Sequence, residues 1–322
     1  MEFEQLRDID GISRWSELRE IDSQTEIPLL VGRELKDCLG VTRFRQGSAL
    51  TDERCYCFTQ NVKRFILKTL PIEHYDEIRR ISEYNYMLFQ EANIPCALPT
   101  EVGACNSDCL VYSIYSLPDG ISADDFARRL STTEQFELGV KAGRLLHKIH
   151  LVTPPPKEIK GDFDDLLKKE LLSLSAKADD ELFEGAREAA QYIEDTLSLV
   201  SQRPQVALHG AFCLRNLYVD KSGAIGLLPL ETAAWGDPVC DFAPMSENFS
   251  YSFMRGQLKG NFPDAVPNDF FSLMALYAAA YAIRTALFSR DGSLNESGYG
   301  KWRAQRVAKD FDSFRCKLPA WY

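Results

Sequence analysis

Two runs in the second half of the chain decide the fold. They read His209-Gly-Ala-Phe-Cys-Leu-Arg-Asn216 and Gly226-Leu-Leu-Pro-Leu-Glu-Thr-Ala-Ala-Trp-Gly-Asp-Pro-Val-Cys-Asp241. The residues Asp220-Lys-Ser-Gly223 between them have the composition of a tight turn. Short apolar segments on both sides of this turn predict a β-rich island over residues 206–232, with a hairpin inside it.

Helical patterns flank this island on both sides. Upstream, Thr132 and Gln135 have the spacing of a capping box, and the apolar residues that follow recur at helical intervals as far as Ile149. Pro154-Pro-Pro156 ends that helix. Further helices are predicted over 183–201 and 269–288, and the second of these is apolar on nearly all sides, which indicates burial.

The first third of the chain has the sequence pattern of a β-sheet. The runs 54–59 and 64–69 are rich in aromatic and β-branched residues and are joined by the polar residues 60–63, which predicts a hairpin. A helix is expected over 73–92, followed by strands near 98–103 and 110–116. The turn residues of Ser116-Leu-Pro-Asp-Gly-Ile121 then mark a hinge before the helical region.

Composition and charge exclude several classes of protein. The chain has 322 residues, enough for two domains or one two-lobed unit, and its 45% hydrophobic and 26% charged residues are ordinary for a globular protein. Its net charge of −10 offers no basic stripe for nucleic acid and no polybasic cluster for anionic lipid. No apolar run reaches the roughly 18 residues of a membrane span, and the charged start lacks the apolar core of a signal peptide. We therefore expect a cytoplasmic protein.

The nine cysteines are scattered and odd in number, which argues against a disulfide framework and against a zinc cluster. Cys105 and Cys109 lie four residues apart in a turn-like stretch, but no histidine lies near them in the sequence. Free thiols are the favoured interpretation.

The two runs resemble the catalytic core of the aminoglycoside phosphotransferase and choline kinase family, the small-molecule branch of the protein-kinase-like fold. In that family the first run reads H-G-D-x-x-x-x-N and the second reads I-D-[FW]-x-x-A-x-x-G-D-P-x-x-D. The similarity extends over about residues 42–290. It includes Leu146-His-Lys-Ile-His150, which is similar to the family's L-x-x-I-H texture.

The resemblance implies roles for several residues. Lys68 would be the phosphate-binding lysine of the third strand, and Glu83 would be its helix partner, with Glu77 as the rival assignment. Asn216 would hold nucleotide and metal. The hinge would lie at about 112–117. Gly47-Ser48 would lie where a phosphate loop is expected, although a plain turn is the favoured explanation of that pair.

The sequence departs from the family at two decisive positions. Ala211 occupies the position of the catalytic base, and Pro229 occupies that of the metal-binding aspartate. Alanine cannot accept a proton, and proline offers a metal only its carbonyl. Glu231 points to the same side of an extended strand as residue 229 and is the alternative metal ligand, but Pro229 is expected to bend or end that strand.

Structural interpretations compete with the functional ones. Lys68 could be an outward-facing lysine on a half-exposed strand, and Asn216 could cap a turn. His209 is expected to bond backbone groups, whereas Asp237 and Asp241 are expected to fix a helix start and the loop as N-caps. These two carboxylates would preserve the fold without any catalysis.

We therefore predict an α+β, bilobal, protein-kinase-like fold with a small β-rich N-lobe and a larger helical C-lobe. Residues 1–40 would form a helical extension, 41–116 the N-lobe and 117–322 the C-lobe with its degenerate loop. The predicted function is that of a pseudokinase that binds a small molecule, peptide, nucleotide or protein partner between its lobes. ATP is the implied cofactor, and the lost carboxylate argues against Mg²⁺. The alternatives are an active small-molecule or peptide hydroxyl kinase with rearranged metal ligands, and a nucleotidyl transferase.

Overall fold

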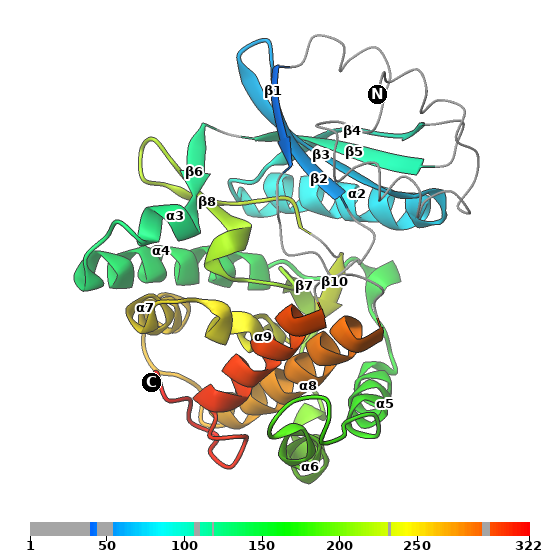
Figure 1. Cartoon of the computed structure of the whole chain (residues 1–322), viewed down its shortest axis with the longest axis vertical. Coiled ribbons are helices and arrows are strands. Elements are labelled where there is room, and N and C mark those ends of the chain that lie inside the picture. Colours follow the sequence, from blue (N-terminus) through cyan, green and yellow to red (C-terminus); the bar gives the residue numbers. More distant parts are fainter. Residues whose placement is uncertain (1–38, 44–53, 106–109, 118, 231–232, 292–296) are drawn as a thin grey trace. The chain divides into compact units, whose positions relative to one another are not determined.

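The computed structural model describes residues 39–43, 54–105, 110–117, 119–230, 233–291 and 297–322 (Figure 1). Its described residues form two compact units. The first comprises those up to Ala123 together with Arg215–Ala233, and the second comprises Asp124–Leu214 and Ala234–Tyr322. The first unit is mainly sheet and the second mainly helix, which confirms the predicted α+β class. The island hairpin groups with the first unit, although the predicted boundary at residue 117 assigns it to the C-lobe.

A five-stranded antiparallel sheet forms the centre of the first unit, in the order β1-β2-β3-β5-β4. Its strands are β1 (Leu39–Arg43), β2 (Arg54–Gln60), β3 (Lys63–Pro71), β4 (Leu98–Cys105) and β5 (Leu110–Leu117). The hairpin predicted over 54–69 is present. Its two turn residues, Asn61 and Val62, both have the positive φ values that a two-residue hairpin requires.

One helix covers a face of this sheet (Figure 1). A 3-10 turn, η4 (Ile72–His74), leads into α2 (Tyr75–Ala92). Ile78 and Ile81 of the helix pack against Leu70 and Val111, which are cross-strand partners on β3 and β5. Because side chains alternate along a strand, Lys68 and its cross-strand partner Ser113 lie on this same covered face.

A second, three-stranded sheet belongs to the same unit. It has the order β6-β8-β9 and comprises β6 (Gly120–Ser122), β8 (Leu217–Asp220) and β9 (Ile225–Leu227). The predicted turn at 220–223 joins β8 to β9, and the Asp220 carboxylate accepts the backbone N–H groups of Ser222 and Ala224. After α2 the chain runs beside β9, where the Leu227 amide donates to Pro95 and the Leu227 carbonyl accepts from Ala97.

The second unit is built from helices around one short ladder. The ladder pairs β7 (Val206–Leu208) with β10 (Ala234–Gly236). The α-helices are α3 (Ala123–Ala127), which begins at the last residue of the first unit, α4 (Thr132–His150), α5 (Phe163–Ser175), α6 (Ala186–Thr196), α7 (Tyr251–Asn261), α8 (Phe270–Asp291) and α9 (Ser297–Asp310). The unit's 3-10 segments are η5 (Pro156–Glu158), η6 (Leu197–Val200) and η8 (Pro238–Glu247), and a further one, η7 (Leu214–Asn216), begins at the last residue before the chain returns to the first unit.

Helices α4 and α7 approach each other closely through glycines. A Cβ atom on Gly143 would lie 2.1 Å from the Gln257 carbonyl oxygen, and one on Gly260 would lie 2.1 Å from that of Val140. Real Cβ atoms do not approach backbone oxygens this closely, so each helix needs glycine where it meets the other.

Helix α8 lies in the core of the second unit. By length and composition its residues Phe270–Arg290 could cross a membrane, but 72% of the relevant window is buried inside the structure. The expectation that no apolar segment is long enough was therefore wrong. Its burial explains the segment as a core helix, because a helix enclosed on all sides by a protein interior is also apolar all round.

Some predicted details move and others lie outside the described residues. The capping box of α4 is formed by Ser131 and Glu134, one residue before the predicted pair. The helix predicted over 183–201 divides into α6 and η6. Several predictions concern residues outside the described part of the chain, namely the first 38 residues, Gly47-Ser48, Cys109 and Glu231. Six of the described cysteines are free thiols.

Candidate functional site

The loop after β7 is held by one buried carboxylate. The backbone N–H groups of His209 and Gly210 donate to the two oxygens of Asp241, at 2.8 and 2.7 Å. Gly210 has a φ of 86°, a conformation that glycine adopts without strain and that turns the loop toward this carboxylate. Asp241 fixes the loop as predicted, but it does so from within the 3-10 segment η8 and not as an N-cap.

Asp241 receives a third hydrogen bond from the end of α4. The His150 Nε2 atom lies 3.0 Å from Asp241 Oδ2, and the Asp241 side chain has no exposed surface. A buried carboxylate is stable only when its oxygens are satisfied, and here three donors from two segments meet at one group. The loop, η8 and the end of α4 are thereby tied together.

His209 is structural within the loop, as predicted. Its Nδ1 atom accepts the Ala211 amide at 3.3 Å, and its ring packs edge-on against Phe212 with the ring centroids 5.1 Å apart. Burial lowers the pKa of His209 from 6.5 to about 4, and the charge of Asp241 only partly opposes this effect. The imidazole is therefore neutral at physiological pH.

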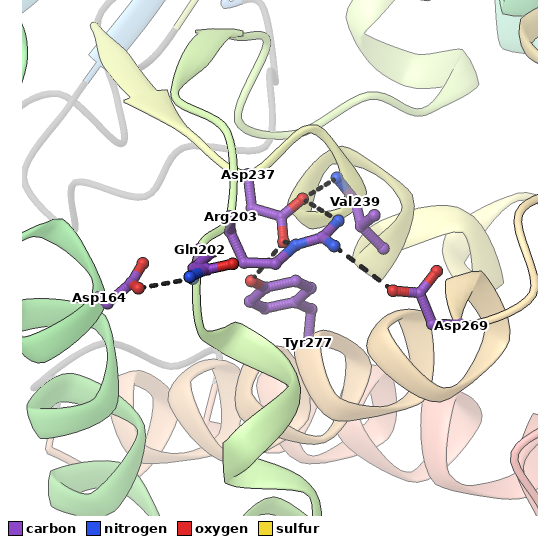
Figure 2. Close-up of polar contacts among 7 residues, drawn as sticks. All are labelled: Asp164, Gln202, Arg203, Asp237, Val239, Asp269 and Tyr277. Atoms are coloured by element: carbon purple, nitrogen blue, oxygen red, sulfur yellow. Dashed lines mark hydrogen bonds and ion pairs between the residues drawn. The ribbon is translucent and has the colours of Figure 1, made fainter.

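Asp237 binds groups from three segments of the second unit (Figure 2). It caps η8 by accepting the Val239 amide at 3.0 Å, which confirms the predicted N-cap. The Arg203 guanidinium binds both oxygens, with Nε at 2.6 Å from Oδ2 and Nη2 at 3.2 Å from Oδ1, and the Tyr277 hydroxyl donates to Oδ2 at 2.8 Å. Arg203 lies just before β7 and Asp237 just after β10, so this ion pair fixes one end of the ladder whose other end leads into the loop.

In the first unit, the segment after β9 contains the position of the missing metal ligand. Pro229 is buried, and strand β9 ends two residues before it, as the missing N–H group of proline predicts. The residues on either side are anchored, because the Leu228 amide donates to the Asn216 carbonyl and the Leu230 amide donates to Asn85 Oδ1, each at 3.0 Å. The segment thus has an ordered backbone without any carboxylate at residue 229.

The lysine and glutamate assignments have different outcomes. The Lys68 side chain is only 2% exposed, so the outward-facing alternative was wrong. Glu83 lies on the exposed side of α2, and no ion pair joins it to Lys68 among the described residues. Glu77, the rival, is part-exposed at the start of α2, where its Oε2 lies 3.0 Å from His74 Nδ1.

The inward polar groups of α2 are Ser82 and Asn85, which sequence reasoning missed. Ser82 Oγ lies 3.1 Å from the Tyr115 hydroxyl, and Asn85 Nδ2 donates to the Ile81 carbonyl while its Oδ1 holds Leu230. A polar residue on an otherwise apolar helix face was the available signal. In the second unit, Asn248 was missed as well, and its Oδ1 accepts the Leu214 amide at 2.8 Å.

The described residues do not fit a metal site. No group of three or more His, Cys, Asp or Glu side chains gathers in the part of the chain that the structure describes. The two positions from which the family resemblance would draw a base and a metal carboxylate carry a methyl group and a pyrrolidine ring.

Comparisons with known proteins agree with this architecture. The model of the phosphotransferase enzyme family matches residues 43–267. The apo form of a thermostable mutant of aminoglycoside phosphotransferase APH(4)-Ia superposes with a TM-score of 0.60 at 15% identity, covering 84% of this chain and 94% of that one. A ternary complex of an APH(4)-Ia variant with ADP and hygromycin B gives 0.57 at 16% identity, covering 84% and 93%.

A choline kinase is also similar. LicA from Streptococcus pneumoniae superposes with a TM-score of 0.55 at 13% identity, covering 85% of this chain and 94% of that one. No curated protein sequence matches the chain significantly. The family model covers most of the chain, and the chain therefore belongs to the phosphotransferase enzyme family, with aminoglycoside phosphotransferases and choline kinase.

Proposed function

We propose that this protein is a pseudokinase of the phosphotransferase family that binds nucleotide without transferring its phosphoryl group. The observation that carries the proposal is the pair of substitutions at Ala211 and Pro229, which stand in segments whose backbones are otherwise fixed. Phosphoryl transfer depends on positioning and on charge stabilisation by metal-bound carboxylates, with a base that receives the hydroxyl proton. This chain supplies neither group at those positions.

The retained anchors support a function other than catalysis. Asp241 holds the loop that contains Ala211, and Asn85 holds the segment that contains Pro229. Asp237 caps η8, the segment that carries Asp241. A base contributes roughly 10² to 10⁴ in rate, and the loss of the metal carboxylate removes further stabilisation of the transition state. A fold that keeps its scaffold while losing both groups is suited to binding.

Lys68 is the residue we assign to the nucleotide. Its ammonium group is buried on the helix-covered face of the sheet, opposite Ser113, whose buried Oγ has no hydrogen-bond partner among the described residues. A buried cation beside a hydroxyl donor suits a phosphate oxygen. The complexes of similar proteins with ADP, and with GDP for an aminoglycoside 2'-phosphotransferase, support this choice of ligand class.

The residues do not fit Mg²⁺, because Pro229 offers no carboxylate. Nucleotide binding should therefore not depend on the metal. A ligand that binds only the native state raises the melting temperature by mass action. We expect ATP to give equal thermal shifts with Mg²⁺ and with EDTA, and we expect no ATP turnover.

Matched lysine variants test the assignment. Lys68→Met should abolish the thermal shift, whereas Lys63→Met, at an exposed position on the same strand, should retain it. Strictly Mg²⁺-dependent binding or ATP turnover by the wild-type protein would overturn the proposal and favour the active-kinase alternative with Glu231 as a metal ligand.

A repair experiment addresses the lost groups directly. The double variant Ala211→Asp with Pro229→Asp should gain Mg²⁺-dependent ATP hydrolysis if only these two groups are missing. Each single variant serves as a control, since each still lacks one group. If the double variant folds and neither binds Mg²⁺ nor hydrolyses ATP, the chain has diverged from a kinase by more than these two positions.

A further inference from the structure

The 3-10 segment η8 contacts the loop after β7 near both of its ends. Close to the beginning of η8, Asp241 accepts the amides of His209 and Gly210. Directly after its last residue, Asn248 accepts the Leu214 amide through Oδ1. The course of the loop from residue 209 to residue 214 is therefore set by η8.

Two tyrosines of α8 bind the carboxylates at the two ends of η8. The Tyr277 hydroxyl donates to Asp237, the N-cap of η8, at 2.8 Å (Figure 2), and the Tyr281 hydroxyl donates to Glu247, its last residue. Residues four apart in a helix lie on the same face, so α8 presents the two hydroxyl groups one turn apart. The two hydroxyl groups of this one helix face therefore bond carboxylates at the beginning and at the end of the same segment.

Each carboxylate also binds an arginine. Arg203 contacts both oxygens of Asp237, and Arg303 donates from Nε to Glu247 Oε1 at 2.6 Å while its guanidinium group lies 5.7 Å from the centroid of the Tyr281 ring. Asp237 is fully buried and Glu247 nearly so. The arginines balance the charges, and the tyrosines add a directed bond that fixes how each carboxylate is oriented.

We propose that Tyr277 and Tyr281 are positioning residues for the loop His209–Leu214, acting through the two ends of η8. Tyr277 fixes the position of the beginning of η8 and thereby the position of the Asp241 carboxylate. Tyr281 fixes the position of the end of η8 and thereby that of Asn248. The proposal does not depend on the pseudokinase function, because it concerns how the loop is held whether or not the loop acts on a ligand.

The chemistry of Tyr277 agrees with a permanent donor role. Burial, followed by the charges of Cys240 and Asp237, raises the pKa of its hydroxyl far above the ordinary value of 10. The hydroxyl therefore keeps its proton at physiological pH. Removing it leaves Asp237 with its arginine but without the bond that orients Oδ2 toward α8.

Hydrogen exchange measured by NMR tests the proposal, because it reports on single amides. In Tyr277→Phe, the Gly210 amide should exchange about tenfold faster, and the exchange rate of the Leu214 amide should rise less. In Tyr281→Phe, the Leu214 amide should show the larger increase and the Gly210 amide the smaller one. Tyr192→Phe is the matched control, since the Tyr192 hydroxyl also bonds α8, at the Ser272 carbonyl, without contacting η8. It should leave both loop amides unchanged.

Global stability must be separated from local loosening. Urea unfolding of each variant gives the change in the global free energy of unfolding. Exchange at Gly210 and Leu214 should become faster than this global change accounts for. If the two amides follow global stability, or respond equally to all three variants, the tyrosines are merely structural and the proposal is wrong. Should Tyr277→Phe fail to fold, Arg203→Lys perturbs the same carboxylate while keeping its charge, and the same selectivity for Gly210 over Leu214 is required.

Discussion

Protonation of His209 should make the stability of this protein fall in mildly acidic solution. The folded protein lowers the pKa of His209 to about 4 because the ring is buried, whereas an unfolded chain has the ordinary value of 6.5. At a pH between these two pKa values, His209 is protonated in the unfolded chain but neutral in the folded protein. The stability from the neutral ring is complete above pH 6.5 and is lost as the pH falls toward 4.

The magnitude follows from the separation of the two values. Each pKa unit corresponds to about 1.36 kcal/mol, so a difference of about 2.5 units corresponds to about 3 kcal/mol. Most of this loss, about 2.5 kcal/mol, should have developed at about pH 4.5, and about 1.4 kcal/mol at about pH 5.5. Such a loss is a large fraction of the total stability of a typical domain.

The comparison with His209→Asn isolates this histidine from other titrating groups. The Asn Oδ1 atom can replace Nδ1 as the acceptor for the Ala211 amide, and asparagine does not titrate. Urea unfolding of both proteins from pH 7.5 to pH 4.5 gives the difference in unfolding free energy at each pH. That difference should shrink by about 2.5 kcal/mol toward acid.

Two results would refute the reasoning. The first is a difference between the two proteins that does not change with pH. The second is an NMR titration in which the His209 ring protonates near pH 6.5, because the ring would then be solvated and not enclosed by Phe212.

Three further predictions concern stability, each measured by the urea midpoint. Val62→Gly should stabilise the protein by about 1 kcal/mol, because valine is strained at a φ of 68° and its side chain is 92% exposed. A lower stability of this variant would contradict the assignment of strain to Val62. Gly143→Ala should destabilise by about 1–3 kcal/mol through its clash with Gln257, whereas Gly161→Ala, which meets nothing within 4 Å, should be nearly neutral; equal effects would contradict the helix contact. Asp241→Ala should cost about 3–5 kcal/mol by leaving two amides and His150 without their acceptor, and more than Asn216→Ala; the reverse order would make Asn216 the structural residue.

Local sequence determined much of this protein. The hairpin of β2 and β3 followed from two β-rich runs and the polar residues 60–63 between them. Strands β8 and β9 followed from Asp220-Lys-Ser-Gly223, because turn residues act within a few positions of the chain. The N-cap role of Asp237 also followed from sequence, since the Val239 amide that it accepts is two residues away. Asp241, by contrast, accepts amides 31 and 32 residues away. The absence of a carboxylate at residues 211 and 229 is a property of the sequence alone.

Tertiary packing decided the rest. Apolar spacing placed a helix at 73–92, but the partners of its polar residues were fixed only by tertiary contact, which gave Ser82 and Asn85 buried bonds and left Glu83 exposed. Similarly, nothing local indicates that Tyr277 and Tyr281 meet carboxylates 40 and 34 residues away. The partners of a buried polar group are chosen by which segments the core brings together, and that information is distributed over the whole chain.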